Sequence, residues 1–363
     1  MTVRINKPAI NLREELADLR KPSGVAGEAM LRAETPQEQF NLIGAGRRNL
    51  ILNGGMQVAQ RGTSDASKTT AGYHVMDRWK SDINNVGTWT ISQEADAPNG
   101  FATSLKYLCT SATSSPTSMY INQRIEGQNL QQTAKGTSDA LPLTLSFWVK
   151  SNVTGVYTAE IYDADNIRHC GKAYTINQSG VWEYKTVTFP PDVIGSFDND
   201  NNLSLYCAFW LAASESTFGS GTFTGTWSTT NQVRKAENQV NLASATNNYW
   251  QITGVQLELG KVATPFEHRS YGEELALCQR YYTQTNFNVQ AYHGASTYAS
   301  ENIHWQQRMR ATPTTTLTAG TTTNVTSTIA YDINNNGCRI EILATNNGRS
   351  FHIGGFVNAD AEL

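Results

Sequence analysis

Aromatic and polar side chains alternate along several expected strands, in a pattern whose chemistry suits sugar recognition. Aromatic rings stack on the apolar C–H faces of a sugar, while Arg, Glu and Asn side chains form hydrogen bonds with its hydroxyl groups. Strand alternation places such residues together on the face turned away from the core. The candidates for glycan contact are Tyr120, Arg124, Trp148, Glu160, Tyr162, Tyr206 and Trp210.

The same residues also have a packing interpretation. If added loops or neighbouring subunits cover this face, Trp148 and Trp210 become core or interface anchors. Another alternative places receptor contact in the C-terminal part, where Tyr292, Tyr298 and Trp305 stand in polar sequence. The sequence leaves glycan contact and packing open as roles for the aromatic face.

Catalytic signatures do not appear in the sequence. It has no G-x-S-x-G, P-loop or H-E-x-x-H motif, and its six histidines are isolated from one another. Glycoside hydrolysis needs two carboxylates that face each other across the scissile bond. Glu160 and Asp163 fall on opposite faces of one strand, which makes them a poor pair. We expect no enzyme activity and no cofactor, with a glycan-processing enzyme as the weaker alternative.

Metal sites have little support in the sequence. Asp198, Asp200 and Asn202 alternate oxygen ligands and form a weak calcium candidate, because no glycine stands at the sixth loop position. A second Asp/Asn cluster, residues 332–337, begins like a calcium loop, but Leu343 stands where the loop needs a glutamate, so a hairpin turn is expected. The five cysteines are widely spaced and form no CxxC pair, which indicates buried free thiols.

Strand-like alternation must position these residues, and it runs from about residue 47 to residue 268. Leu143, Leu145, Phe147 and Val149 share one face of a strand, and residues 203–211 repeat the scheme. Short strands separated by turn signals, with no long helix between them, predict a mainly β protein with a jelly-roll β-sandwich. The expected strands are 89–93, 105–109, 120–125, 144–150, 157–162, 184–189, 203–211 and 249–259. Residues 217–230, rich in Gly, Thr and Ser, are expected to form a surface loop.

Three segments follow from the change of pattern along the chain. Residues 1–46 carry two short helix signals and no core of their own, and they form an expected attachment arm. Residues 47–268 form the sandwich, and residues 269–363 form a linker helix, at 272–281, followed by a small distal β domain. The residues expected to anchor the arm are Ile5, Ile10, Leu12, Leu16, Leu19, Phe40 and Leu42.

Composition excludes several classes of partner. Charged residues make up 16 % of the chain and the net charge is −3, so no basic field is present to hold nucleic acid. No apolar run approaches the roughly 20 residues that span a bilayer, and the first residues contain no apolar signal-peptide core. We expect neither membrane insertion nor export through a signal peptide, and the free thiols suit assembly in a reducing cytosol.

Short motifs around the sandwich resemble a known family. Asn49-Leu-Ile-Leu-Asn-Gly-Gly55, Gln60-Arg-Gly62 and Asp77-Arg-Trp79 resemble the opening of carbohydrate-binding-module-like jelly rolls found in phage tail-fibre and other virion proteins. Gly254-Val-Gln-Leu-Glu-Leu-Gly260, followed by Ala263-Thr-Pro-Phe-Glu267, resembles their last strand.

The resemblance extends towards both ends of the chain. Leu277-Cys-Gln-Arg-Tyr-Tyr282 is similar to a helix that follows this jelly roll in phage proteins, and Asp360-Ala-Glu-Leu363 is similar to the ends of phage fibres. Residues 5–48 resemble the arms of structural proteins from marine and cyanobacterial phages.

This resemblance implies a phage virion protein, most simply a tail-fibre or receptor-binding subunit. Its partners would be other virion proteins, contacted through the arm, and a host surface glycan, and the family's fibres are homotrimers. The alternative is a purely structural capsid-decoration, tail or baseplate component that touches no receptor.

Overall fold

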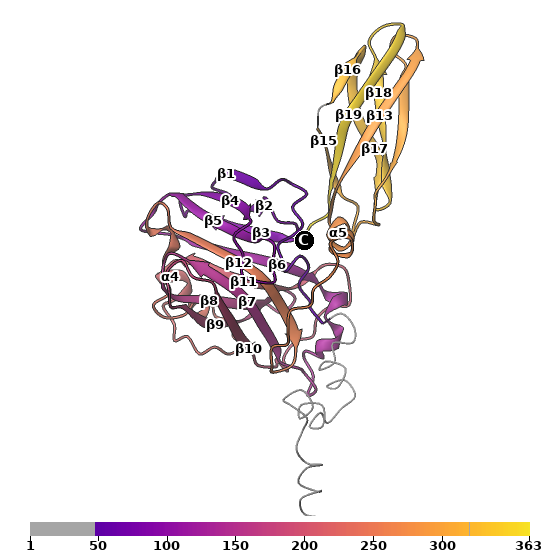
Figure 1. The fold of residues 1–363 in the computed structure, drawn as a ribbon. Helices are drawn as coiled ribbons and strands as arrows, with labels where there is room; N and C mark the ends of the chain where they lie inside the picture. Colours follow the sequence, from indigo (N-terminus) through magenta and orange to yellow (C-terminus); the bar gives the residue numbers. More distant parts are fainter. Residues whose placement is uncertain (1–47, 319) are drawn as a thin grey trace, which may run out of the picture. The chain divides into compact units, whose positions relative to one another are not determined.

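A computed structural model describes residues 48–318 and 320–363 of the chain (Figure 1). The chain separates into two units, Met1–Arg48 and Asn49–Leu363. The expected attachment arm and its seven anchoring residues therefore lie outside the described residues, and they remain predictions. Within the described part, no helix is long and apolar enough to cross a membrane.

Two six-stranded antiparallel sheets form a jelly-roll β-sandwich, so the mainly β fold class expected from the sequence is confirmed (Figure 1). Sheet A contains, in spatial order, β1 (Ser64–Lys68), β4 (Thr88–Glu94), β5 (Ser104–Ser111), β12 (Tyr249–Leu259), β7 (Leu143–Ser151) and β10 (Glu183–Phe189). Sheet B contains β2 (Gly72–Tyr73), β3 (Trp79–Asn84), β6 (Ser118–Glu126), β11 (Leu203–Ala213), β8 (Gly155–Asp163) and β9 (Arg168–Ile176).

Strand alternation explains how the two sheets close over one core. Along β7, Leu145, Phe147 and Val149 are fully buried, while the residues between them point to the outer face of sheet A. The facing sheet contributes Phe209 from β11, whose ring lies 4.9 Å from that of Phe147. Removal of this apolar surface from water is the main force that holds the sandwich together.

All eight strands expected in the sandwich are confirmed, and four were missed. The missed strands are β1, β2, β3 and β9. β9 places Cys170, Tyr174 and Ile176 in the core, but Lys172 stands between them on the same side and interrupts the apolar alternation in the sequence. Its position is set by its pairing with β8, in which Glu160 lies opposite Gly171.

The connection between β11 and β12 contains the surface loop expected at residues 217–230, where no residue is buried, and continues into a buried stretch at residues 234–236. Residues 214–240, named here the covering segment, contain a single-turn helix α4 (Glu215–Phe218) and the 3-10 turn η3 (Asn231–Val233). Phe218 packs on Trp210 of sheet B with 5.0 Å between ring centroids. The segment is polar in composition, yet it lies over part of a sheet. The remaining 3-10 turns of the sandwich are η1 (Gly127–Asn129), η2 (Gln131–Thr133) and η4 (Leu242–Ser244).

Helix α5 (Tyr271–Gln279) precedes a distal block of two smaller sheets. Its first turn is capped by Ser270, whose hydroxyl accepts a hydrogen bond from the amide of Glu273. One sheet joins β13 (Tyr282–His293), β19 (Gly348–Asp360), β15 (Thr314–Thr318) and β16 (Thr321–Thr323). The other joins β14 (Tyr298–His304), β18 (Gly337–Ala344) and β17 (Val325–Asn334), and the expected hairpin turn at 334–337 is confirmed.

Candidate functional site

The seven glycan-contact candidates do not share one surface. Trp148 lies on β7 and points outward from sheet A. The other six lie on β6, β8 and β11 and point outward from sheet B. Alternation tells which side chains avoid the core, but it does not tell to which sheet a strand belongs. The single face expected from the sequence is therefore two faces, on opposite sides of the sandwich.

The covering segment closes part of the outer face of sheet B through a buried ion pair. Arg234 donates two hydrogen bonds of 2.8 Å to the carboxylate of Glu160 and one of 2.8 Å to the hydroxyl of Tyr206. The indole of Trp210 donates to the same carboxylate at 3.0 Å. Burial alone would lower the pKa of Arg234, but the adjacent carboxylate outweighs burial and raises it.

Burial decides the role of the residues beneath this ion pair. Glu160 and Trp210 are 0 % exposed and Tyr206 is 8 % exposed. Their polar atoms are satisfied by one another and by Arg234. In this arrangement they hold the covering segment on sheet B and offer no surface to a sugar, so the packing interpretation describes them.

The remaining candidates on sheet B border the covered area. Tyr162 and Tyr120 stack on either side of Tyr206, with ring centroids 4.7 and 6.2 Å from it and nearly parallel planes. The stacked faces of these rings are in contact with one another. Arg124 donates a hydrogen bond of 2.7 Å to the backbone oxygen of Leu363. Like the buried three, these residues are engaged within the chain.

The outer face of sheet A, in contrast, carries an open hollow of about 430 Å³. This volume falls in the range of small-ligand sites, roughly 300–1,000 Å³. We name it the aromatic hollow. It is lined by Asn99, Gly100, Phe101, Ser146, Trp148, Tyr184, Gly254, Pro265, Phe266 and His268.

Strand register and two loops position the rings of the aromatic hollow. Trp148 on β7 lies directly opposite Tyr184 on β10, with 5.4 Å between their ring centroids. Phe101 comes from the β4–β5 connection, and Phe266 and His268 follow β12. Phe101 meets Phe266 edge to face at 5.0 Å. Tyr184 is 46 % exposed, so part of this aromatic surface is open to solvent.

A glycine in β12 makes room for one of these rings. Gly254 has φ of +63°, a left-handed conformation, at an irregularity in the pairing of β12 with β7. A Cβ atom at this position would lie 2.6 Å from Cζ of Phe101. Any other residue would therefore meet both backbone strain and a steric clash.

The aromatic hollow combines apolar ring faces with uncharged hydrogen-bonding groups. Its ten lining residues include no Asp, Glu, Lys or Arg. Asn99, Ser146 and the Tyr184 hydroxyl supply donors and acceptors beside the rings. Such a surface can stack on the C–H face of a sugar and bind its hydroxyls, as the pattern around Trp148 suggested.

Of the hollow residues, only Trp148 was among the candidates predicted from the sequence. Tyr184 begins an expected strand, and its alternation with Thr186 marks it as outward-facing, so a signal for it was present. Phe101, Phe266 and His268 stand in loops, where no periodicity assigns a side chain to a face. The other proposed cluster also separates, because Trp305 is buried while Tyr292 and Tyr298 are 85 % and 62 % exposed.

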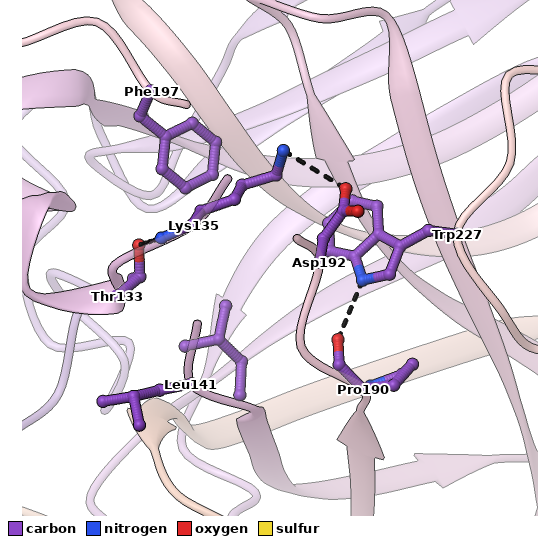
Figure 2. Close-up of a pocket in the computed structure, with 8 residues that line it drawn as sticks. Thr133, Lys135, Leu141, Pro190, Asp192, Phe197 and Trp227 are labelled. Carbon is purple, nitrogen blue, oxygen red and sulfur yellow. Dashed lines mark hydrogen bonds and ion pairs between the residues drawn. The ribbon is translucent and has the colours of Figure 1, made fainter. Parts of the chain in front are cut away.

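A second, much smaller cavity lies beside Lys135, Asp192 and Trp227, which are among the residues that line it (Figure 2). Its volume of about 10 Å³ leaves room for roughly one water molecule. The Nζ atom of Lys135 lies 2.6 Å from Asp163 and 3.2 Å from Asp192, and it donates to the backbone oxygens of Ile194 and Gly195. Figure 2 also shows the Trp227 indole donating to the carbonyl of Pro190. This is a buried structural charge cluster.

The weak calcium candidate receives no support from the geometry. The carboxylate of Asp200 accepts hydrogen bonds from the amide and from the side chain of Asn202, so the loop closes on itself. The amide of Asp198 donates to the carboxylate of Asp165. Among the described residues, no three His, Cys, Asp or Glu side chains gather as a metal site would require. All five cysteines are buried and free, as expected.

No family model matches the sequence, and no curated protein sequence matches it. Among solved structures, the chain is similar to the enzymatically active domain of bacteriophage CBA120 tailspike protein 4, with 13 % identity, a TM-score of 0.32, and alignment of 58 % of this chain with 21 % of that one. The chain therefore spans about a fifth of the tailspike domain's length.

Carbohydrate-binding modules are also among the similar structures. TmCBM61 in complex with β-1,4-galactotriose aligns over 59 % of this chain and 99 % of its own, with 10 % identity and a TM-score of 0.28. The family 11 module from Clostridium thermocellum aligns over 57 % and 98 %, with 12 % identity and a TM-score of 0.27. The strand order itself defines the class of this protein, a jelly-roll β-sandwich with an open aromatic hollow on one sheet.

Proposed function

We propose that this protein is a phage virion protein, a tail-fibre or receptor-binding subunit that binds host surface glycans through the aromatic hollow. The observation that carries the glycan part is the open group of rings around Trp148 and Tyr184, flanked by uncharged polar groups. The phage part rests on the motif resemblances at residues 49–62 and 254–267.

The proposed binding is non-covalent and non-catalytic. No carboxylate lines the aromatic hollow, so the acid and base pair that glycoside hydrolysis needs is not present there. On sheet B, Glu160 is held in the buried ion pair with Arg234. A carboxylate fixed in this way has neither the access to water nor the freedom to act on a sugar.

In this proposal, residues 1–46 attach the protein to other virion components and the subunits assemble as homotrimers. Each hollow would form a weak site, and three linked sites would strengthen attachment because the second and third contacts are intramolecular. The protein would act in the virion after assembly in the host cytoplasm.

A second candidate function is that of a structural tail, baseplate or capsid component without receptor contact. One observation favours it: the distal block carries apolar side chains on its outside that its own sheets do not cover. They are Ile329, Tyr331, Ile353 and Phe356, each 39–44 % exposed. Where exposed apolar side chains join into a contiguous patch, the patch often marks a contact with another chain.

A binding experiment with the full chain separates these functions. Purified protein is applied to an array of neutral oligosaccharides and to host envelope polysaccharide, with release of reducing sugar followed in parallel. We expect binding without sugar release, and loss of binding in Trp148→Ala. Tyr331→Ala, which removes a ring that is 39 % exposed in the distal block and belongs to neither set of sugar-contact candidates, is the matched control and should bind normally.

Each other outcome has a clear meaning. Sugar release would establish an enzyme, and loss of that activity on carboxylate replacement would locate its site. Normal folding with no binding to any saccharide or to host cells would leave the structural alternative.

A further inference from the structure

A tryptophan and an ion pair lie directly beside the aromatic hollow on the outer face of sheet A. Lys150 follows Trp148 by two residues on β7, and Trp182 precedes Tyr184 by two residues, one position before β10 begins. A spacing of two places both on the same face as the hollow residues. None of Lys150, Trp182 and their partner Asp96 lines the hollow itself.

Asp96 connects the two side chains. Its carboxylate accepts a hydrogen bond of 2.5 Å from Nζ of Lys150 and one of 3.1 Å from the indole of Trp182. The ammonium group of Lys150 also lies 5.8 Å from the centre of the Trp182 ring. Asp96 belongs to the β4–β5 connection that also supplies Phe101 to the hollow. The cluster of Asp96, Lys150 and Trp182 is therefore joined to the hollow through this connection.

The cluster keeps hydrogen-bonding capacity for a ligand. The Asp96 side chain is 49 % exposed and that of Lys150 is 15 % exposed. Burial would raise the pKa of Asp96, but the hydrogen bonds from Lys150 and Trp182 outweigh it and lower the pKa, so the carboxylate is ionised near neutrality. An ionised carboxylate accepts several hydrogen bonds and an ammonium donates three, so one mutual bond leaves further positions for sugar hydroxyls.

We infer that the ligand is a chain of sugars, with one residue in the aromatic hollow and the next on Trp182, bound by Asp96 and Lys150. This inference rests on the proposed function, because it extends the same site. Two residues along a strand correspond to about 6.7 Å, which is on the scale of one pyranose unit in a glycan. The indole then offers the next sugar a ring face, and the ion pair orients its hydroxyl groups.

The consequence is a dependence of affinity on chain length. A monosaccharide fills only one of the two positions, whereas a longer chain reaches both. Titration calorimetry with the full chain would use neutral gluco-, galacto- and manno-oligosaccharides of one to six units. For the series that binds, we expect at least tenfold higher affinity for four units than for one, a difference of about 1.4 kcal/mol.

Two substitutions at Trp182 separate its ring from its N–H group. Trp182→Ala should reduce the preference for four units to twofold or less and leave the affinity for the single sugar unchanged. Trp182→Phe keeps a ring but removes the bond to Asp96, so it should retain part of the preference. Tyr331→Ala in the distal block, as the control, should match the parent protein at every length.

Two results would overturn the inference. Equal affinity for one and four units in the parent protein would show a single subsite. A length preference that survives in Trp182→Ala, with the melting temperature unchanged, would show that Trp182 does not form the second position. Both leave the proposed function standing, because sugar is still bound. Failure of every saccharide to bind would instead overturn the proposed function together with this extension.

Discussion

The outer faces of the two sheets are built from similar residues but have different surroundings. On sheet B, Tyr206 and Trp210 lie beneath the covering segment, which Arg234 attaches to the sheet through Glu160. On sheet A, Trp148 and Tyr184 border an open hollow. An outward aromatic side chain is therefore a core residue on one sheet and a candidate ligand contact on the other.

The difference comes from the connections and not from the strands. The covering segment supplies a cation and an aromatic ring, Arg234 and Phe218, to the face of sheet B. The loops beside sheet A contribute Phe101 and Phe266, which pack on each other at the side of the aromatic hollow and leave the hollow open to solvent. The comparison predicts that substitutions on sheet B change stability, and that substitutions around the hollow change binding.

The largest expected effect is the loss of stability in Arg234→Met. This change leaves the carboxylate of Glu160, which is 0 % exposed, without its cation. Removal of one partner from a buried ion pair typically costs about 3–5 kcal/mol, and we expect a loss of this size in urea denaturation. Saccharide binding by the folded variant should not change.

The double variant Glu160→Gln with Arg234→Met is the control, since it removes the charge and its partner together and should recover part of the loss. If Arg234→Met costs less than about 1 kcal/mol, the ion pair does not hold the covering segment. The residues beneath that segment would then return as candidates for ligand contact.

A somewhat smaller loss of about 3 kcal/mol is expected for Lys135→Met, which leaves Asp163 and Asp192 without their shared ammonium group. Asp192 keeps its hydrogen bonds with Arg168, which limits the effect. Thermal unfolding of the parent protein and of Lys135→Met at several pH values measures this loss of stability.

The pH dependence of this loss has a definite sign. Burial would raise the pKa of Asp192, but hydrogen bonds from Arg168 and the charge of Lys135 outweigh it and lower the pKa below 3.8. A carboxyl group whose pKa is lower in the folded than in the unfolded protein stabilises the fold at pH values above its unfolded-state pKa. This contribution to stability is lost as the pH falls through the folded-state pKa. The difference in stability between the parent protein and Lys135→Met should therefore become smaller below about pH 4. A gap that widens on acidification would contradict the assigned ion pair.

On the open face, Gly254→Ala should reduce binding more than stability. The added Cβ would lie 2.6 Å from the Phe101 ring, at a backbone position with φ of +63°. Left-handed strain costs roughly 1–2 kcal/mol, and displacement of Phe101 would open one wall of the hollow. Calorimetric titration and denaturation of one sample measure both effects. Gly354→Ala in the distal block tests the strain alone, because Gly354 also has positive φ, +68°, but an added Cβ there meets no atom within 4 Å.

The smallest expected effect is that of Tyr120→Ala on sheet B. We expect unchanged saccharide affinity, because the Tyr120 ring stacks within the sheet B face and lies away from the aromatic hollow. Stability should fall by about 1 kcal/mol from the lost ring contacts. A marked loss of affinity in this variant, together with normal affinity in Trp148→Ala, would reverse the assignment of the two faces.

Much of the fold could be predicted from local patterns. The alternation of Leu145, Phe147 and Val149 marked an inward face, and the burial of all three confirms it. The Asn-rich turn before Gly337 identified a hairpin, and the acidic first turn at residues 273 and 274 identified α5. These signals are local because they depend on neighbours within a few residues along the chain.

The candidate site could be predicted only in part. Trp148 was identified because alternation marks outward side chains, but its partners were misassigned because strand order is a long-range property. β7 pairs with β12 and β10, whereas β11 pairs with β6 and β8. Residues that look equivalent in sequence can therefore lie on opposite faces of the molecule.

The sequence by itself determined the class of fold, the inward and outward side of each main strand, and a supply of outward aromatic residues. Only the tertiary structure decided which of those residues stay open. That outcome depends on where the covering segment lies, and on Arg234 reaching Glu160 across 74 positions of sequence. Such long-range contacts follow from the packing of the whole sandwich, which no local pattern of residues specifies.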